Sequence, residues 1–141
     1  MARDNENVQN RRIFLFATAS SLALGQSEGV IKGRLQKGRQ LRTADGIVNL
    51  EADESIGALL DDERVIGMEL EIEGQSKTAK QFAVNPVHRK PVYTYADGKR
   101  LLVSYWCDVC YIRFYRPGTC WCCQKEVLLD PKDPTTPERV P

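Results

Sequence analysis

The residues of this sequence best suited to chemistry are its five cysteines, which all lie within residues 107–123. They include two C-x-x-C pairs, Cys107 with Cys110 and Cys120 with Cys123, separated by nine residues. A C-x-x-C turn presents two sulfurs on one side of a tight loop, and two facing turns offer four thiolates in the tetrahedron that Zn²⁺ accepts. The spacing therefore predicts one metal site, with zinc as the metal and these four cysteines as its ligands.

Two other residues are alternative ligands for the same site. Cys122 is a fifth sulfur, so either Cys122 or Cys123 could be the last ligand. We expect Cys123, because residues at i and i+3 of such a turn converge, whereas the side chain of Cys122 should point away from its neighbour. His88 is the only histidine of the chain and could replace one sulfur, although its position between two prolines is typical of an exposed loop.

The cysteine segment resembles zinc ribbons and rubredoxin-like knuckles over about seventeen residues. That resemblance implies a metal ion bound by four thiolates, and the same sulfurs also suit iron or copper(I). The sequence departs from these families in two respects. Tyr111 and Gln124 stand after the second cysteine of each pair, where glycine is usual, and the nine-residue spacer is shorter than in the ribbon pattern.

Disulfide bonds are an alternative use of the same cysteines. Exported proteins enter an oxidising compartment where cysteines commonly pair, and two bridges between the pairs would close a hairpin and leave one thiol over. A redox role is a further alternative: an Fe–S₄ electron carrier, or thiol–disulfide exchange at Cys107-Asp108-Val109-Cys110. The βαβ context of thioredoxin-like enzymes is not indicated by this sequence.

The first 25 residues have the pattern of a bacterial export signal. A polar segment ends in Arg11-Arg12, an apolar stretch follows, and small residues before Gln26 would allow cleavage there. Residues 10–15 resemble the twin-arginine pattern, in which two arginines precede a variable residue and two apolar ones. This resemblance implies export of a protein that has folded in the cytoplasm with its cofactor loaded. We therefore expect a periplasmic or extracellular location.

Charge composition argues against a nucleic-acid partner. The 141 residues contain 20 Lys and Arg against 19 Asp and Glu, a formal net charge of +1, so no strongly basic character is present. Five cations lie within residues 32–42, and for an exported protein we interpret them as a solvated strand face. No apolar run reaches the roughly 18 residues of a membrane span, so we expect none after removal of the signal.

Strand patterns dominate residues 29–129. Residues 68–73 alternate apolar and acidic side chains, which predicts a strand with Met68, Leu70 and Ile72 inward and three glutamates in water. Ala-Asp-Gly occurs twice between apolar runs and predicts two tight hairpins, because Asp-Gly supplies the positive-φ residues that such turns need. The turns are at residues 44–46 and 96–98, and further strands are expected at residues 30–35, 81–84 and 101–106.

One short helix is expected near residue 56. Ser55 can cap it, three apolar residues spaced i, i+3 and i+4 share one face, and Gly67 follows its end. These apolar residues are Ile56, Leu59 and Leu60.

About six strands and one helix predict a mainly β fold, a small antiparallel barrel or sandwich with a C-terminal cysteine-rich hairpin. The oligonucleotide/oligosaccharide-binding (OB) barrel is the nearest familiar architecture. We expect a cleavable signal at residues 1–25 and a single β domain at 26–130, with the hairpin at 105–125. A Pro-rich tail at 131–141 should stay clear of the core.

These features favour an exported binding or structural module without catalysis, whose partner is an unidentified protein or small molecule. The alternative is the redox protein described above. Residues 105–130 also resemble small exported bacterial proteins of unassigned function, from which no activity carries over.

Overall fold

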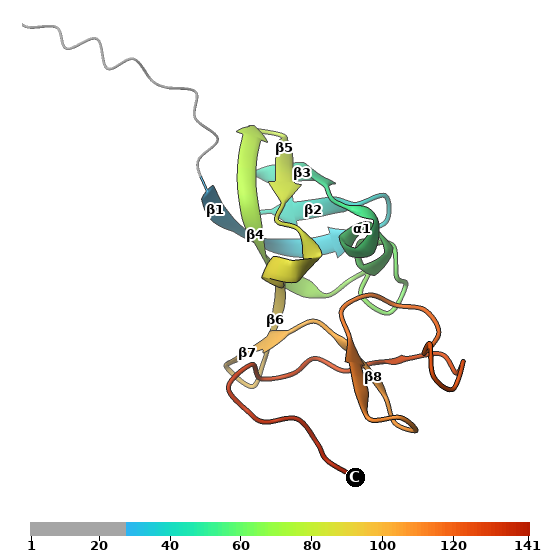
Figure 1. The fold of residues 1–141 in the computed structure, drawn as a ribbon. Coiled ribbons are helices and arrows are strands. Elements are labelled where there is room, and N and C mark those ends of the chain that lie inside the picture. Colours follow the sequence, from blue (N-terminus) through green and yellow to red (C-terminus); the bar gives the residue numbers. More distant parts are fainter. Residues whose placement is uncertain (1–27) are drawn as a thin grey trace, which may run out of the picture.

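The computed structural model describes residues 28–141, which form a mainly β domain with one α-helix (Figure 1). The predicted export signal lies outside the described residues. Five strands close a barrel: β1 (Glu28–Gln36), β2 (Gln40–Thr43), β3 (Gly46–Glu51), β4 (Glu69–Thr78) and β5 (Gln81–Val84). A small β barrel with one short helix and a C-terminal cysteine cluster confirms the predicted fold class.

The barrel has the order β1-β2-β3-β5-β4, and it closes because β4 also pairs with β1. All these pairings are antiparallel except that of β3 with β5, which is parallel, so the barrel is mainly antiparallel. The helix α1 (Glu54–Leu60) connects β3 to β4. A five-stranded Greek-key barrel of this kind is the OB-type architecture.

Both Ala-Asp-Gly segments form hairpin turns, as predicted. The first joins β2 to β3, with Thr43 opposite Gly46. The second joins β6 (Val92–Ala96) to β7 (Lys99–Leu102), and there Asp97 and Gly98 have φ of 51° and 74°. Positive φ at both central residues gives the turn a twist that matches the flanking strands. Strand β6 also pairs with β4, so this second hairpin extends the sheet beyond the barrel.

The helix lies where the sequence predicted it, but its cap is a different residue. Asp53 is extended and its carboxylate accepts a hydrogen bond of 2.7 Å from the Ile56 N–H, whereas Ser55 lies inside the helix. The helix ends at Leu60, well before Gly67. The predicted apolar face is confirmed, because Ile56, Leu59 and Leu60 are all buried.

Strand β4 supplies the centre of the core and one correction. Leu70 and Ile72 are buried as expected and Met68 is half-buried, but Glu71 is only 7% exposed rather than solvated. Strand β6 pairs with β4, so side chains of the β6–β7 hairpin lie beside Glu71 on the same face of the sheet. There Arg100 and Tyr95 donate hydrogen bonds of 2.9 and 2.7 Å to its carboxylate. An alternating pattern marks one buried face and cannot reveal that side chains of neighbouring strands shield one residue of the other face.

A second, three-stranded sheet carries the cysteines. It contains β8 (Tyr105–Cys107), β9 (Ile112–Phe114) and β10 (Leu128–Leu129) in the order β10-β8-β9. The run expected as one strand at residues 101–106 is divided between β7 and β8, with buried Val103 and Ser104 between them. A short 3₁₀ helix at Val87–Arg89 precedes β6.

The Pro-rich C-terminal segment contacts the domain, unlike the free tail that we expected. Lys132 forms a β-bridge with Leu102, and Asp130 and Glu138 both bind the side chain of Arg113. Proline removes hydrogen-bond donors from this segment, but its carboxylates can still pair with a cation of the sheet. None of the helices formed by residues 28–141 has the length and apolar character needed to cross a membrane.

Candidate metal centre

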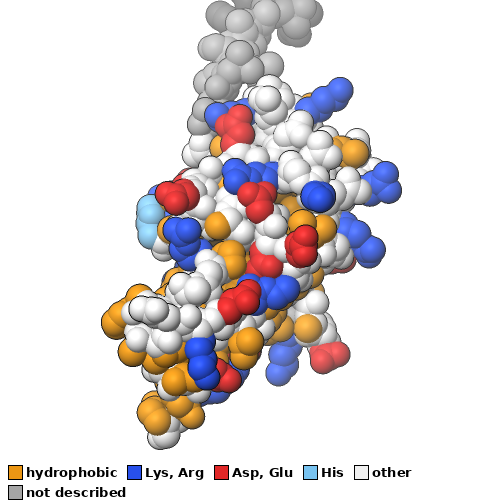
Figure 2. Space-filling model, turned by 90° about the vertical axis from the view of Figure 1, so that its right-hand side faces the viewer, with side chains coloured by type: hydrophobic (Ala, Val, Ile, Leu, Met, Phe, Trp, Pro, Cys, Tyr) orange, Lys and Arg blue, Asp and Glu red, His pale blue; other side chains and the backbone are white. Residues whose placement is uncertain are grey.

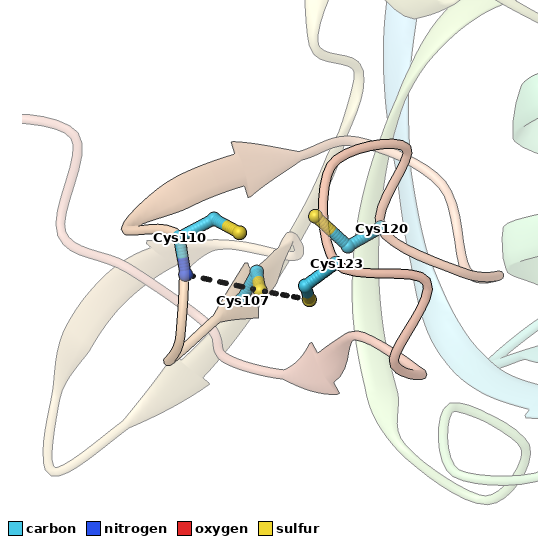
Figure 3. Close-up of side chains that lie close together, drawn as sticks. All are labelled: Cys107, Cys110, Cys120 and Cys123. Atoms are coloured by element: carbon cyan, nitrogen blue, oxygen red, sulfur yellow. Dashed lines mark hydrogen bonds between the residues drawn. The ribbon is translucent and has the colours of Figure 1, made fainter.

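Four cysteines from two turns converge on one point (Figure 3). The sulfurs of Cys107, Cys110, Cys120 and Cys123 all lie within 4.8 Å of one another, and those of Cys107 and Cys123 are 3.5 Å apart. Four thiolates around zinc at about 2.3 Å would place their sulfurs about 3.8 Å from each other. The cluster therefore has the size and the donor set for one tetrahedral metal ion, and residues 28–141 contain no other such group of His, Cys, Asp or Glu.

The first turn follows directly from β8, which ends at Cys107. The Cys110 N–H donates to the Cys107 sulfur at 3.4 Å, and the Tyr111 N–H donates to the Cys107 carbonyl oxygen at 2.9 Å. These bonds wind the chain so that the two sulfurs face the same side. Tyr111 then takes a left-handed conformation with φ of 55°, and the chain enters β9.

The second turn repeats this geometry without a flanking strand of comparable length. The Gln124 N–H donates to the Cys120 carbonyl oxygen at 2.8 Å, and Gln124 has φ of 61°. A β-bridge between Thr119 and Glu126 closes the base of the turn. The two residues that replace the usual glycine, Tyr111 and Gln124, thus adopt the backbone conformation that glycine favours. The departure in sequence does not alter the turn.

Hydrogen bonds in the second turn favour a thiolate at Cys120. Main-chain donation from Cys123, and then from Cys122, outweighs burial and lowers the pKa of the Cys120 thiol to about 7. A hydrogen bond with the Cys122 side chain is the main cause that raises the pKa of Cys110 above its usual value. Because metals bind thiolates rather than thiols, these main-chain hydrogen bonds suit Cys120 to the role of a metal ligand.

The alternative ligands lie outside the cluster. Cys122 is exposed and is not one of the four mutually close residues, so the structure groups Cys123 with the other three. His88 lies exposed on the 3₁₀ helix and does not join the sulfurs either. All five cysteines are free, and the 3.5 Å between Cys107 and Cys123 is far longer than the roughly 2.05 Å of a disulfide.

A buried polar group holds the cysteine sheet against the barrel. The hydroxyl of Tyr105, which is fully buried, donates a 2.7 Å hydrogen bond to Asp62, two residues after the helix. Arg64 binds the same carboxylate and donates to the Val127 carbonyl oxygen at 2.9 Å. Burial alone would raise the pKa of Asp62, but hydrogen bonds from Arg64 and Tyr105 hold it below its usual value. The site is thereby anchored on both sides, at β8 and beside β10.

A second anchor lies on the other side of β8. The Arg113 side chain is 6% exposed, lies 4.9 Å from the Trp106 ring centre and binds Asp130 and Glu138. Trp106 also meets Tyr111 edge-on, with ring centres 5.8 Å apart. Sequence reasoning missed these contacts because their members are far apart in the chain and carry no motif. Trp121, which lies between Cys120 and Cys122 in the sequence, is 75% exposed.

Comparison with known proteins adds no family to this picture. The chain matches no protein-family model, no curated protein and no solved structure.

Proposed function

We propose that this protein is an exported, non-catalytic β-barrel module whose cysteine-rich hairpin is fixed by one structural zinc ion. The ligands are Cys107, Cys110, Cys120 and Cys123. The observation that carries the proposal is the convergence of their four sulfurs, from two turns of the same geometry, within 4.8 Å.

The donor set favours a structural role over a catalytic one. Four thiolates fill the tetrahedral shell of zinc, whereas catalytic zinc sites keep one position for water or substrate. The elements beside the site are also very short, since β9 has three residues and β10 has two. A metal that joins the two turns would contribute part of the folding free energy of this region.

Metal content measured on natively purified protein tests the ligand assignment. We expect about one zinc per chain in the wild type. Cys123→Ser should lose most of this zinc and Cys122→Ser should retain it, because Cys123 belongs to the cluster and Cys122 does not. Two disulfides by mass with no metal would overturn the proposal. Iron together with visible absorption would replace it with the electron-carrier alternative.

The proposed export depends on the sequence of residues 1–25, and the route depends on the pair Arg11-Arg12 within it. Replacing both arginines with lysine preserves the charge and should block the twin-arginine route. Export of the double variant at the wild-type level would reject that route. The partner of an exported module of this kind is a protein or a small molecule.

Exposed apolar side chains on the cysteine sheet support a role in binding a partner. Hydrophobic side chains gather on the lower half of the molecule in Figure 2, the half that holds the cysteine sheet, while cations and anions are interspersed on the barrel above. Four large apolar residues around the turns and β10 are at least 42% exposed: Val109, Tyr111, Trp121 and Leu128.

A further inference from the structure

The barrel is open along part of one strand. Strand β1 pairs with β2 only from Arg34 to Gln36. At Gly33 the two strands come so close that a side chain would collide with the Arg42 carbonyl oxygen, and toward the start of β1 they separate. The first six residues of β1 therefore have β4 on one side and no strand of residues 28–141 on the other.

The main-chain groups on this open side can be identified. The Leu35 N–H donates to Met68, and the Leu35 carbonyl accepts from Gly67, so this residue of β1 faces β4. Main-chain groups of successive residues alternate in an antiparallel strand. Val30 and Lys32 consequently direct their N–H and C=O groups away from β4, into the opening, where no strand of the described chain meets them.

A pocket with an apolar lining lies beside this edge. Its volume is about 490 Å³, and it is bounded by β1, the β2–β3 turn and the β4–β5 turn. Ile31, Val48 and buried Phe82 are among its lining residues. Two further apolar residues stand in the opening, Val30 at 52% and Ile47 at 43% exposed. Unpaired strand edges with exposed apolar side chains are templates for another strand.

We propose that the open edge of β1 binds an extended peptide segment of a partner protein, which adds a strand to the barrel and places an apolar side chain in the pocket. The available edge of about 20 Å suits a segment of about six residues. The pocket wall contains two lysines, Lys32 and Lys80, and one carboxylate, Asp45, so its net positive charge favours an acidic residue in the segment.

The shape of the opening selects this occupant over a second copy of the chain. The β2–β3 turn, residues 43–48, stands on the far side of the pocket from β1. Because a single extended chain is only one strand wide, we infer that it enters this space more readily than the edge of another folded sheet. The pocket also lies at the end of the barrel opposite the cysteine sheet, near the β4–β5 connection at the top of Figure 1. This inference therefore does not depend on the metal site.

Selection from a random heptapeptide phage library, with the full-length protein as bait, tests the proposal. We expect enrichment of alternating sequences with an apolar residue and an acidic residue. The matched variants are Val30→Pro, which removes a main-chain donor of the open side, and Val30→Ala, which keeps it. Affinity for the selected peptides should fall more than tenfold in Val30→Pro and less than threefold in Val30→Ala.

Two measurements on the unchanged protein keep the test independent of how the proline variant folds. A selected peptide N-methylated on one alternate set of residues should lose binding, and the peptide methylated on the other set should keep it. In amide exchange, Val30 and Lys32 should exchange rapidly alone and slowly with the peptide. Ile31 and Gly33, whose N–H groups face β4, should exchange slowly in both states.

Three outcomes would overturn the proposal. The first is no enrichment, and the second is enrichment of peptides whose binding survives Val30→Pro or survives both patterns of N-methylation. The third is slow exchange of Val30 and Lys32 without peptide, together with a dimer that Val30→Pro abolishes, which would assign the edge to a second copy. Metal content is measured in the same samples, so loss of the zinc proposal would be recognised separately.

Discussion

Single residues in the cysteine turns hold the backbone in a conformation that side chains ordinarily avoid. Tyr111 and Gln124 have φ of 55° and 61°, and each N–H completes its turn by bonding the carbonyl of the first cysteine. A non-glycine residue pays about 1–2 kcal/mol for this conformation. The turn hydrogen bonds, and the metal that we propose, must outweigh that cost.

Gln124→Gly should therefore stabilise the metal-loaded protein by up to about 1 kcal/mol, less than the strain because glycine is also more flexible when unfolded. Gln124→Val should destabilise it, since a β-branched residue fits positive φ poorly. Denaturant unfolding at fixed free zinc measures both changes. Gln124 is the better test because Tyr111 also packs on Trp106. Equal stability of the glycine and valine variants would show that the turn relaxes.

A second prediction at this scale concerns Glu71, whose carboxylate is buried between an arginine and a tyrosine. Glu71→Ala should cost about 1–3 kcal/mol, since charged hydrogen bonds are lost and Arg100 keeps some solvent access. The exposed Glu69 is the control, and Glu69→Ala should cost less than about 1 kcal/mol. A Glu71→Ala cost as small as that of Glu69→Ala would mean that the side chains of the β6–β7 hairpin do not shield Glu71.

The same carboxylate gives this prediction a pH dependence. Burial would raise the pKa of Glu71, but the hydrogen bond from Tyr95 and the charge of Arg100 hold it below its usual value. A lowered folded-state pKa gives stability that is present above the unfolded value of about 4.3 and is lost as pH falls through the folded value. The stability difference between wild type and Glu71→Gln should therefore be constant near pH 7 and shrink below about pH 4.

At the scale of elements, the sequence predicted the features that depend only on residues close together in the chain. Both Asp-Gly hairpins and the apolar face of the helix follow from the conformational needs of a few adjacent residues. The exposure of Glu71 could not be predicted, because the hairpin that covers it begins some 20 residues later. Ser55 and Asp53 are both good helix N-caps by residue type, and the choice between them depends on where strand β3 ends.

The C-terminal segment gives the prediction at this scale. Ending the chain after Lys132 keeps its bridge with Leu102 but removes Glu138, one of the two carboxylates on nearly buried Arg113. The loss should destabilise the domain by about 1–3 kcal/mol, because a charged hydrogen bond is removed where little water can replace it. Thermal unfolding at fixed zinc measures it, with Glu63→Gln, an exposed change elsewhere, as control. A truncated protein of wild-type stability would show that the segment merely rests on the sheet.

At the scale of the whole molecule, the cysteine sheet and the barrel share one core. Tyr105, Cys120 and Val127 belong to the same buried cluster as Leu35 and Phe82 of the barrel. The hydrogen bonds from Tyr105 to Asp62 and from Arg64 to Val127 cross the same boundary. We therefore expect the two sheets to unfold together, although the proposed zinc contacts only one of them.

Removal of zinc tests this coupling. Trp106 lies in the cysteine sheet and reports on it by fluorescence once exposed Trp121 is changed to phenylalanine, while far-ultraviolet circular dichroism reports mainly on the barrel strands. A ligand that binds only the folded state stabilises the whole cooperative unit. Chelation should therefore lower both unfolding midpoints by the same amount, and Cys122→Ser should respond as the wild type does. If the fluorescence midpoint fell while the dichroism midpoint stayed, the zinc would stabilise the hairpin alone and the shared core would not couple the two sheets.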